Sequence, residues 1–316
     1  MKPDEPVLSV VVPLFNEEAL AEELVLRTLK SCRSLEVPFE LLLVNDGSLD
    51  GTLRRLVEMS RRFPELRVVD LLRNFGHMPA LSAGIFLAQG QAVVTMDGDL
   101  QDPPELIPKL FARWKEGAEV VYAVRVAREE APLQKAATGI FYWILDRISE
   151  TPIPKQVGTF GLMDRKVADL LNRLPERDRF FAGLRSWAAG REASVPYGRP
   201  DRPFGRSRVG TRGLFRLART AMVSFSKVPL RYASALSLGF GLLLFGVGLW
   251  AVLEKLFTDR AIPGWATYTT MLGMFGFVQS LVLAILAEYV AVIFDEVKRR
   301  PAYVVRQEYA RGEPAE

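Results

Sequence analysis

The sequence predicts an α/β domain with a mostly parallel sheet, followed by two helices that cross a membrane. In the first 125 residues, short apolar runs alternate with segments of helical spacing, and two long uncharged stretches come late in the chain. The expected strands are 7–15, 39–44, 66–72, 91–96 and 119–124. The expected helices are 17–33, 50–62, 77–89 and 104–115. Because the strands are continuous apolar runs, helices should cover both faces of the sheet.

Two long apolar segments follow this region. Ala233–Leu253 contains 21 residues without a charge, and Ala266–Ala287 contains 22. Each exceeds the roughly 20 residues that cross the hydrocarbon core of a bilayer. A pair of buried core helices is the alternative, but the length and the lack of a polar stripe favour membrane spans.

Basic residues are concentrated just before the first apolar segment. The formal net charge is +4, and residues 199–231 hold nine Lys or Arg but one acid. A basic region beside a span favours an anionic membrane surface as the partner and argues against nucleic acid. Within 209–231, Arg212, Arg216 and Arg219 share one helical face and apolar residues fill much of the rest. This pattern predicts a basic amphipathic helix in the membrane interface, with an ordinary solvated helix as the alternative.

The flanking charges also predict the topology. Lys227 and Arg231 precede the first span and Lys298–Arg300 follow the second, whereas the connecting loop is balanced in charge. A two-helix transmembrane domain (232–296) separates the α/β domain (1–208) from a C-terminal tail (297–316) in the sequence. By the positive-inside rule, the α/β domain and the tail both lie in the cytoplasm. The single Cys32 agrees with a reducing compartment and should be a buried small hydrophobic residue.

Polar side chains gather where the predicted strands end. Asp97 and Asp99 follow the fourth strand, and residues two apart on an extended segment point the same way. The carboxyl ends of parallel strands share one edge, where open α/β sheets bind ligands. The other polar residues expected at this edge are Asn16, Glu17, Glu18, Asp46, Gly47, Ser48, Arg73, Asn74, His77 and Gln101.

A hard divalent cation is the natural counterion for the paired carboxylates of Asp97 and Asp99. Mg²⁺ and Mn²⁺ prefer oxygen ligands and usually bind substrate phosphates as well. A solvated acidic turn is the alternative, because D-x-D is a short motif, but the convergence of four loops favours the metal. No glycine-rich dinucleotide motif or P-loop follows any strand, which argues against a dinucleotide oxidoreductase and a P-loop ATPase.

Several segments resemble the family 2 glycosyltransferases, which have the GT-A fold. They are VVVPLFNEE, LLLVNDGSLDGT, the stretch from LLRNFGHMPAL to LQDPPELIPKL, and LMDRKV. RFFAGLRSWAAG, VPYGRPDRPFGRSRV, AEYVAVIFDEVKRRPAYVV and the two spans resemble, more narrowly, the bacterial polyprenyl-phosphate glycosyltransferases. These are relatives of dolichol-phosphate mannose synthase, the bactoprenol glucosyltransferases and the undecaprenyl-phosphate aminoarabinose transferases. The resemblance covers almost the whole chain in order.

The resemblance implies inverting transfer of a sugar from a UDP- or GDP-sugar to polyprenyl (undecaprenyl) phosphate, for cell-envelope or lipopolysaccharide glycosylation. The site would face the cytoplasm at a bacterial inner (plasma) membrane that the chain crosses twice. By match, Asp97, Asp99 and Gln101 would hold Mg²⁺ or Mn²⁺ and the diphosphate, and Arg206 and Arg208 would lie near the acceptor phosphate; these five are the predicted catalytic residues. The predicted substrate-binding residues are Pro13, Asn16, Glu18, Asp46, Ser48, Arg73, His77, Thr159 and Arg185. The sequence leaves the oligomeric state open, with a homo-oligomer as one alternative.

One stretch departs from the family's pattern. Relatives often have G-D-F-R-L-M-D-R, with an acid implicated near the reacting centre, whereas residues 158–165 read G-T-F-G-L-M-D-R. Thr159 and Gly161 leave open a changed sugar, a changed site or a non-catalytic protein that binds nucleotide sugar. A transferase with another lipid acceptor is a separate alternative. A polyprenyl phosphate is already an anion at neutral pH and needs little general-base help, so catalysis stays the leading hypothesis. Asp164 is expected to cap the next helix.

Overall fold

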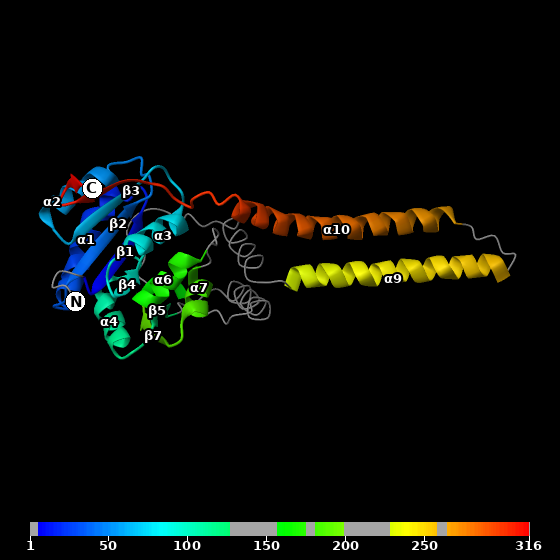
Figure 1. Ribbon diagram of the computed structural model, residues 1–316, viewed down its shortest axis with the longest axis horizontal. Helices are drawn as coiled ribbons and strands as arrows, with labels where there is room; N and C mark the ends of the chain where they lie inside the picture. The colour runs from blue at the N-terminus through cyan, green and yellow to red at the C-terminus, as the bar shows by residue number, and fades with distance from the viewer. Residues whose placement is uncertain (1–5, 127–156, 175–180, 199–227, 258–263, 316) are drawn as a thin grey trace. The chain divides into compact units, whose positions relative to one another are not determined.

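The computed structural model describes residues 6–126, 157–174, 181–198, 228–257 and 264–315 (Figure 1). The chain divides into two compact units. The α/β unit contains the described residues up to 198 together with 300–315. The helical unit contains the described residues from 228 to 299.

Nine strands of the described residues form one sheet in the order β7-β5-β6-β4-β1-β2-β3-β8-β9. They are β1 (Leu8–Leu14), β2 (Phe39–Asn45), β3 (Leu66–Leu71), β4 (Ala92–Thr95), β5 (Val120–Arg125), β6 (Val157–Asp164), β7 (Glu192–Tyr197), β8 (Val305–Ala310) and β9 (Glu313–Pro314). Strands β4, β1, β2 and β3 run parallel, which confirms the predicted α/β class. Strand β6 is antiparallel to both β4 and β5, and β8 is antiparallel to β3.

Helices cover both faces of the sheet, as predicted (Figure 1). They are α1 (Glu18–Arg33), α2 (Thr52–Arg62), α3 (His77–Leu87), the 3₁₀ turn η1 (Pro104–Leu106), α4 (Ile107–Lys115), α6 (Arg165–Arg173) and α7 (Phe181–Ala188). Val10 and Val12 of β1 belong to the core cluster that includes α1. Val11 faces the opposite side, where a Cβ added to Gly84 of α3 would lie 2.2 Å from its Cγ1. Gly84 therefore allows α3 to pack closely on the sheet.

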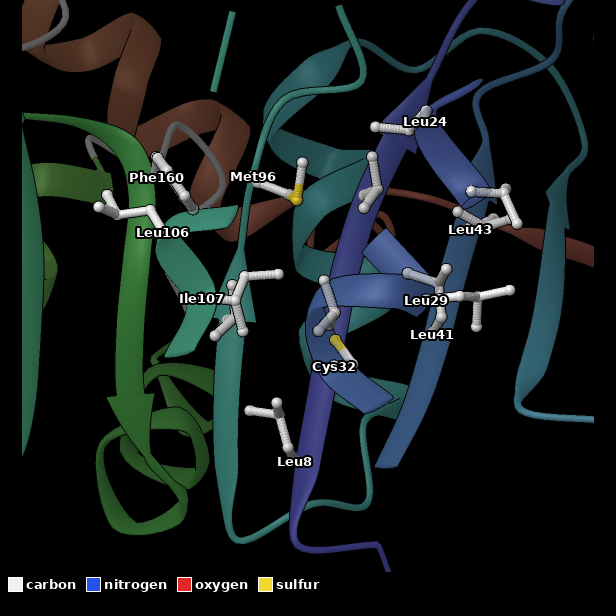
Figure 2. Close-up of a cluster of buried hydrophobic side chains, with 14 of the residues drawn as sticks. Leu8, Leu24, Leu29, Cys32, Leu41, Leu43, Met96, Leu106, Ile107 and Phe160 are labelled. Carbon is white, nitrogen blue, oxygen red and sulfur yellow. The ribbon is translucent and has the colours of Figure 1, made fainter. Parts of the chain in front are cut away.

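The core on the α1 side also includes residues that adjoin the predicted site. Figure 2 shows Leu24, Leu29 and Cys32 of α1 lying against the strands, with Met96 and Phe160 in the same cluster. Cys32 is fully buried, as predicted, and burial raises the pKa of its thiol to about 12. Met96 directly precedes Asp97, and Phe160 directly follows Thr159. Packing of these two side chains therefore fixes the backbone on both sides of the predicted site.

Every strand and helix expected in the first 125 residues is present, with small differences at the ends. Helix α2 begins at Thr52 because Asp50 lies in the preceding turn and accepts the Thr52 N–H. Strands β6 to β9 were not predicted from the sequence. In particular, the segment 297–316, predicted only as a tail, contributes β8 and β9 to the sheet.

The helical unit consists, in its described part, of α9 (Val228–Phe257) and α10 (Trp265–Val297). Within them, Tyr232–Trp250 and Thr270–Phe294 are long and apolar enough to cross a membrane. Many of their large apolar side chains are exposed, such as Phe245 at 70% and Phe277 at 71%. Exposure of this kind disfavours the alternative of buried core helices. Residues 209–227 of the expected interfacial helix lie outside the described residues.

Candidate active site

The loops that follow β1 and β2 hold each other in place. Asn16 adopts a left-handed backbone with φ of 54°, a conformation that asparagine tolerates better than most residues. Its N–H donates to Ser48 Oγ at 3.0 Å, and the Leu49 N–H donates to Asn16 Oδ1 at 2.8 Å. The structure therefore brings the predicted residues Asn16 and Ser48 together.

Asp46 connects the loop after β2 to the loop after β3. It is 3% exposed, and its carboxylate accepts the N–H groups of Phe75 at 2.7 Å and Gly76 at 2.9 Å. Burial raises the pKa of Asp46, and these two hydrogen bonds and His77 offset part of that rise. Gly47 has φ of 63°, and a Cβ there would lie 2.4 Å from the Arg73 carbonyl carbon. The two loops are thus in direct contact, and the carboxylate keeps further lone pairs for a ligand.

Asp97 lies where three segments of the chain meet. Its Oδ1 accepts a hydrogen bond from Thr159 Oγ1 at 2.8 Å and lies 3.3 Å from His77 Nε2. The register of β4 and β6, which pairs Thr95 with Gly161, explains the first contact. Two residues beyond that pair, Thr159 comes opposite Asp97. Two predicted site residues from other segments, Thr159 and His77, therefore both contact Asp97.

The turn between the two aspartates is tightly packed. A Cβ on Gly98 would lie 2.6 Å from Leu14 Cδ2 and 3.1 Å from the Pro13 carbonyl oxygen. The end of β1, at the buried Pro13 and Leu14, therefore packs against this turn. Asp99 Oδ1 accepts the Gln101 N–H at 3.1 Å, so these two predicted residues also lie together.

The donor set suits a hard divalent cation that is bound in part by substrate. Asp97 and Asp99 supply carboxylate oxygens, which Mg²⁺ and Mn²⁺ prefer. Within the described ranges, no group of three or more His, Cys, Asp or Glu residues could hold a metal. Two carboxylates fit an ion that completes its coordination with phosphate oxygens and water.

A chain of hydrogen bonds that was not predicted from the sequence supports the backbone of Asp97. Arg125 Nε donates to Tyr197 Oη at 3.2 Å, and Tyr197 Oη donates to Asp102 Oδ1 at 2.8 Å. Asp102 Oδ2 in turn accepts the Asp97 N–H at 3.2 Å. Burial, together with the nearby Asp97 charge, raises the pKa of Asp102 to about 6. Asp102 stands in the QDPP run, but Arg125 and Tyr197 come from β5 and β7, which only the fold places here.

Arg185, predicted to bind substrate, lies within the α/β unit on α7. It is fully buried, and its guanidinium donates to the carbonyl oxygens of Gly158 at 2.6 Å and Thr159 at 3.3 Å. It also lies over the Phe181 ring at 4.7 Å. Burial lowers the pKa of Arg185 to about 10. The enclosed guanidinium therefore holds the backbone of β6, and the substrate contact of Arg185 stays a prediction.

Arg185 also explains why residue 161 is a glycine. A Cβ at this position would lie 2.6 Å from the Val121 carbonyl oxygen and 2.8 Å from Arg185 Nη1. The neighbouring strand and the guanidinium fill the space that a side chain would need.

The remaining predicted residues are more peripheral, or lie outside the described residues. Glu18 is exposed and accepts the Gly51 N–H at 2.9 Å. Arg73 is exposed and stacks on the Phe75 ring at 4.6 Å. Arg206 and Arg208 fall outside the described ranges. The expected helix cap is confirmed, because Asp164 accepts the Lys166 N–H at 3.0 Å at the start of α6.

Comparisons with known proteins identify the family. Residues 9–171 match the model of "Glycosyl transferase family 2". The chain is 40% identical over 305 residues to the uncharacterized glycosyltransferase YkcC of Bacillus subtilis (strain 168), covering 95% of this chain and 94% of that protein. It is 35% identical over 310 residues to the SfII prophage-derived bactoprenol glucosyl transferase of Shigella flexneri, covering 97% of this chain and 99% of that protein.

Solved structures also match part of the chain. One is glucosyl-3-phosphoglycerate synthase from Mycobacterium tuberculosis in complex with Mn²⁺, uridine diphosphate and glucosyl-3-phosphoglycerate. It has a TM-score of 0.43 at 21% identity and covers 69% of this chain and 78% of that one. The family match and the full-length relatives show that this chain belongs to glycosyl transferase family 2 and is a glycosyltransferase homologous to bactoprenol glucosyl transferases.

Proposed function

We propose that the chain is a metal-dependent glycosyltransferase that moves a hexose from a UDP- or GDP-sugar to polyprenyl phosphate at the cytoplasmic face of a bacterial inner membrane. The observation that carries this proposal is one chain that combines the Asp97–Asp99 pair at the strand ends with two apolar helices of membrane length. A relative named for glucosyl transfer to bactoprenol, a polyprenol, matches over almost the full length of both chains.

The interlocked loops after β1, β2 and β3 are the proposed nucleotide pocket. Asp46 has unused lone pairs for a base or ribose, and Asn16 and Ser48 define the shape of the pocket wall. Asp97, Asp99 and Gln101 would hold Mg²⁺ or Mn²⁺, which supplies positive charge against the leaving diphosphate. His77, 3.3 Å from Asp97, would orient that carboxylate or contact the diphosphate.

The proposed reaction needs little proton transfer within the protein. An acceptor phosphate oxygen would form a bond to the anomeric carbon as the bond from that carbon to the diphosphate breaks, with inversion. Because the acceptor phosphate is ionised at neutral pH, positioning and electrostatic stabilisation should dominate the catalysis. The hydroxyl of Thr159 already donates to Asp97. Thr159 therefore suits the role of orienting the proposed metal-binding carboxylate, and not the role of a general base.

Arg206 and Arg208 remain proposed contacts of the acceptor phosphate, since guanidinium groups bind phosphate with paired N–H groups. The basic region 199–231 and the positive flanks favour a cytoplasmic domain on an anionic membrane surface. Thr159 in place of an acid keeps a second candidate open, a membrane protein that binds nucleotide sugar without transfer. Another lipid acceptor is the third.

The test is transfer by the purified full-length protein in detergent, with undecaprenyl phosphate and a panel of labelled UDP- and GDP-sugars, with and without EDTA. We expect EDTA-sensitive label in the organic phase from one donor. Asp99→Asn should abolish transfer, whereas Asp169→Asn should not, because Asp169 is half exposed on α6 and pairs with Arg165 at 3.5 Å. Full activity of Asp99→Asn would refute the metal mechanism. Nucleotide binding without any transfer would favour the non-catalytic candidate, and label only in another lipid would favour the third.

A further inference from the structure

The C-terminal strand carries an arginine that reaches the end of β3. Arg306 Nη1 lies 3.3 Å from Asp70 Oδ2, and Nη2 donates to the Leu72 carbonyl oxygen. Beside them, the Leu72 N–H donates to the Val304 carbonyl oxygen at 2.9 Å. Residues 304–306 therefore hold both the end of β3 and the first residue beyond it.

From Asp70, the contacts continue into the loop after β2. Asp70 Oδ1 accepts a hydrogen bond from Asn45 Nδ2 at 2.7 Å, and Asn45 Oδ1 accepts the Ser48 N–H at 3.4 Å. The side chain of Asp70 is 2% exposed, and a buried carboxylate is costly unless a cation and hydrogen bonds compensate it. Arg306 supplies the cation, so it stabilises the group that holds Asn45 and, through it, Ser48.

A second set of contacts runs through the loop after β3. Leu72, fixed by Arg306 and Val304, leads directly into Arg73–Gly76. Within that loop, Phe75 and Gly76 donate to Asp46. The backbone at Arg73 lies so close to Gly47 that no Cβ would fit there. The loops after β2 and β3, two of the three that form the proposed nucleotide pocket, are therefore tied to β8.

We propose that Arg306 is a positioning residue for nucleotide binding: it acts through Asp70 and Leu72 to keep the loops after β2 and β3 in their binding shape. This inference rests on the proposed function of those loops as the nucleotide pocket. It assigns the C-terminal segment a role in the enzyme, although it follows the second apolar helix and lies more than 230 residues from Asp70 in sequence.

The same strand offers a matched control two residues further along, at Glu308. Glu308 Oε2 lies 3.1 Å from Arg67 Nη2, and Arg67 also pairs with Glu40 at 2.7 Å. Arg67 is near the amino end of β3, whereas the loops of the proposed nucleotide pocket follow the carboxyl ends of the strands. Glu308→Gln therefore weakens a contact between the same two strands without touching Asp70 or Leu72.

The test compares wild type, Arg306→Ala, Arg306→Lys and Glu308→Gln as full-length proteins in detergent. Hydrogen exchange without nucleotide should rise about tenfold in peptides covering 45–52 and 72–77 of Arg306→Ala, since a hydrogen-bonded charged contact is lost. The Kd for UDP or GDP, measured with Mn²⁺ by calorimetry, should rise about tenfold as well. Arg306→Lys, which keeps the charge but loses the paired N–H groups, should lie in between. Glu308→Gln should match wild type in both measurements.

The outcomes separate this inference from the proposed function. If wild type binds nucleotide and both Arg306 variants bind it as tightly, the positioning role is refuted and the proposed function stands. Equal exchange changes in Arg306→Lys and Glu308→Gln would also refute the role, because a general loosening of β8 would then explain them. If wild type binds neither UDP nor GDP, the proposed function fails and the positioning role fails with it. Should Arg306→Ala not fold, Arg306→Lys decides by the same criteria.

Discussion

Thr159→Val is the sharpest test of how the chain holds the carboxylate of Asp97. Valine keeps the branched shape that suits a strand but removes the hydroxyl that donates to Asp97 Oδ1 at 2.8 Å. A hydrogen bond to a charged group contributes about 1.5–3 kcal/mol, which corresponds to roughly 10- to 150-fold in an equilibrium constant. Because the Asp97 side chain is 26% exposed, water can replace part of the lost bond. We therefore expect the lower end, about tenfold.

The assay measures transfer over a range of buffered Mn²⁺ concentrations. Thr159→Val should need about ten times more Mn²⁺ for half-maximal transfer, since its Asp97 carboxylate is less well oriented. Thr159→Ser keeps the hydroxyl and should stay close to wild type. Thr28→Val is the matched control, because the Thr28 hydroxyl donates to the Leu24 carbonyl oxygen inside α1. An unchanged Mn²⁺ dependence in Thr159→Val, or an equal shift in Thr28→Val, would refute the reasoning.

Two further predictions concern the support around this site. Gly161→Ala should lower the free energy of unfolding by about 1–3 kcal/mol in denaturant titrations, because its Cβ would press on the backbone of β5; wild-type stability would contradict the packing argument. For Asp102, with a pKa raised to about 6, the folded state binds the proton more tightly than the unfolded state. Its contribution to stability should therefore be full below about pH 4, fall as the pH rises towards about 6, and stay constant above that. Asp102→Asn lacks this titration, so the stability difference between wild type and variant should change over that range; a difference independent of pH would rule out the assignment.

The parallel half of the sheet could be predicted because its information is local. Each apolar run, such as the one ending at Asn45, is followed by turn residues and a helix, and parallel strands place such ends on one edge. Asp46, Asp97 and His77 were therefore found from the sequence as members of one edge. The residues that support Asp97 through Asp102 could not be found in this way. Tyr197 of β7 reaches Asp102 only through the order of strands in the folded sheet.

The departure from the family pattern at Thr159 and Gly161 also depends on contacts that the sequence does not show. From the sequence alone, the missing acid and arginine leave a changed site and a non-catalytic protein as alternatives. In the structure, the Arg185 guanidinium enters from α7 and binds the carbonyl oxygens of Gly158 and Thr159. It occupies the space beside Gly161, so a large side chain at 161 and Arg185 in its present place exclude each other. Thr159, held through its carbonyl oxygen by both Arg185 and Thr95 Oγ1, then directs its hydroxyl at Asp97. The departure is therefore part of a consistent local arrangement, in which Arg185 and Thr95 hold the residue that donates to Asp97.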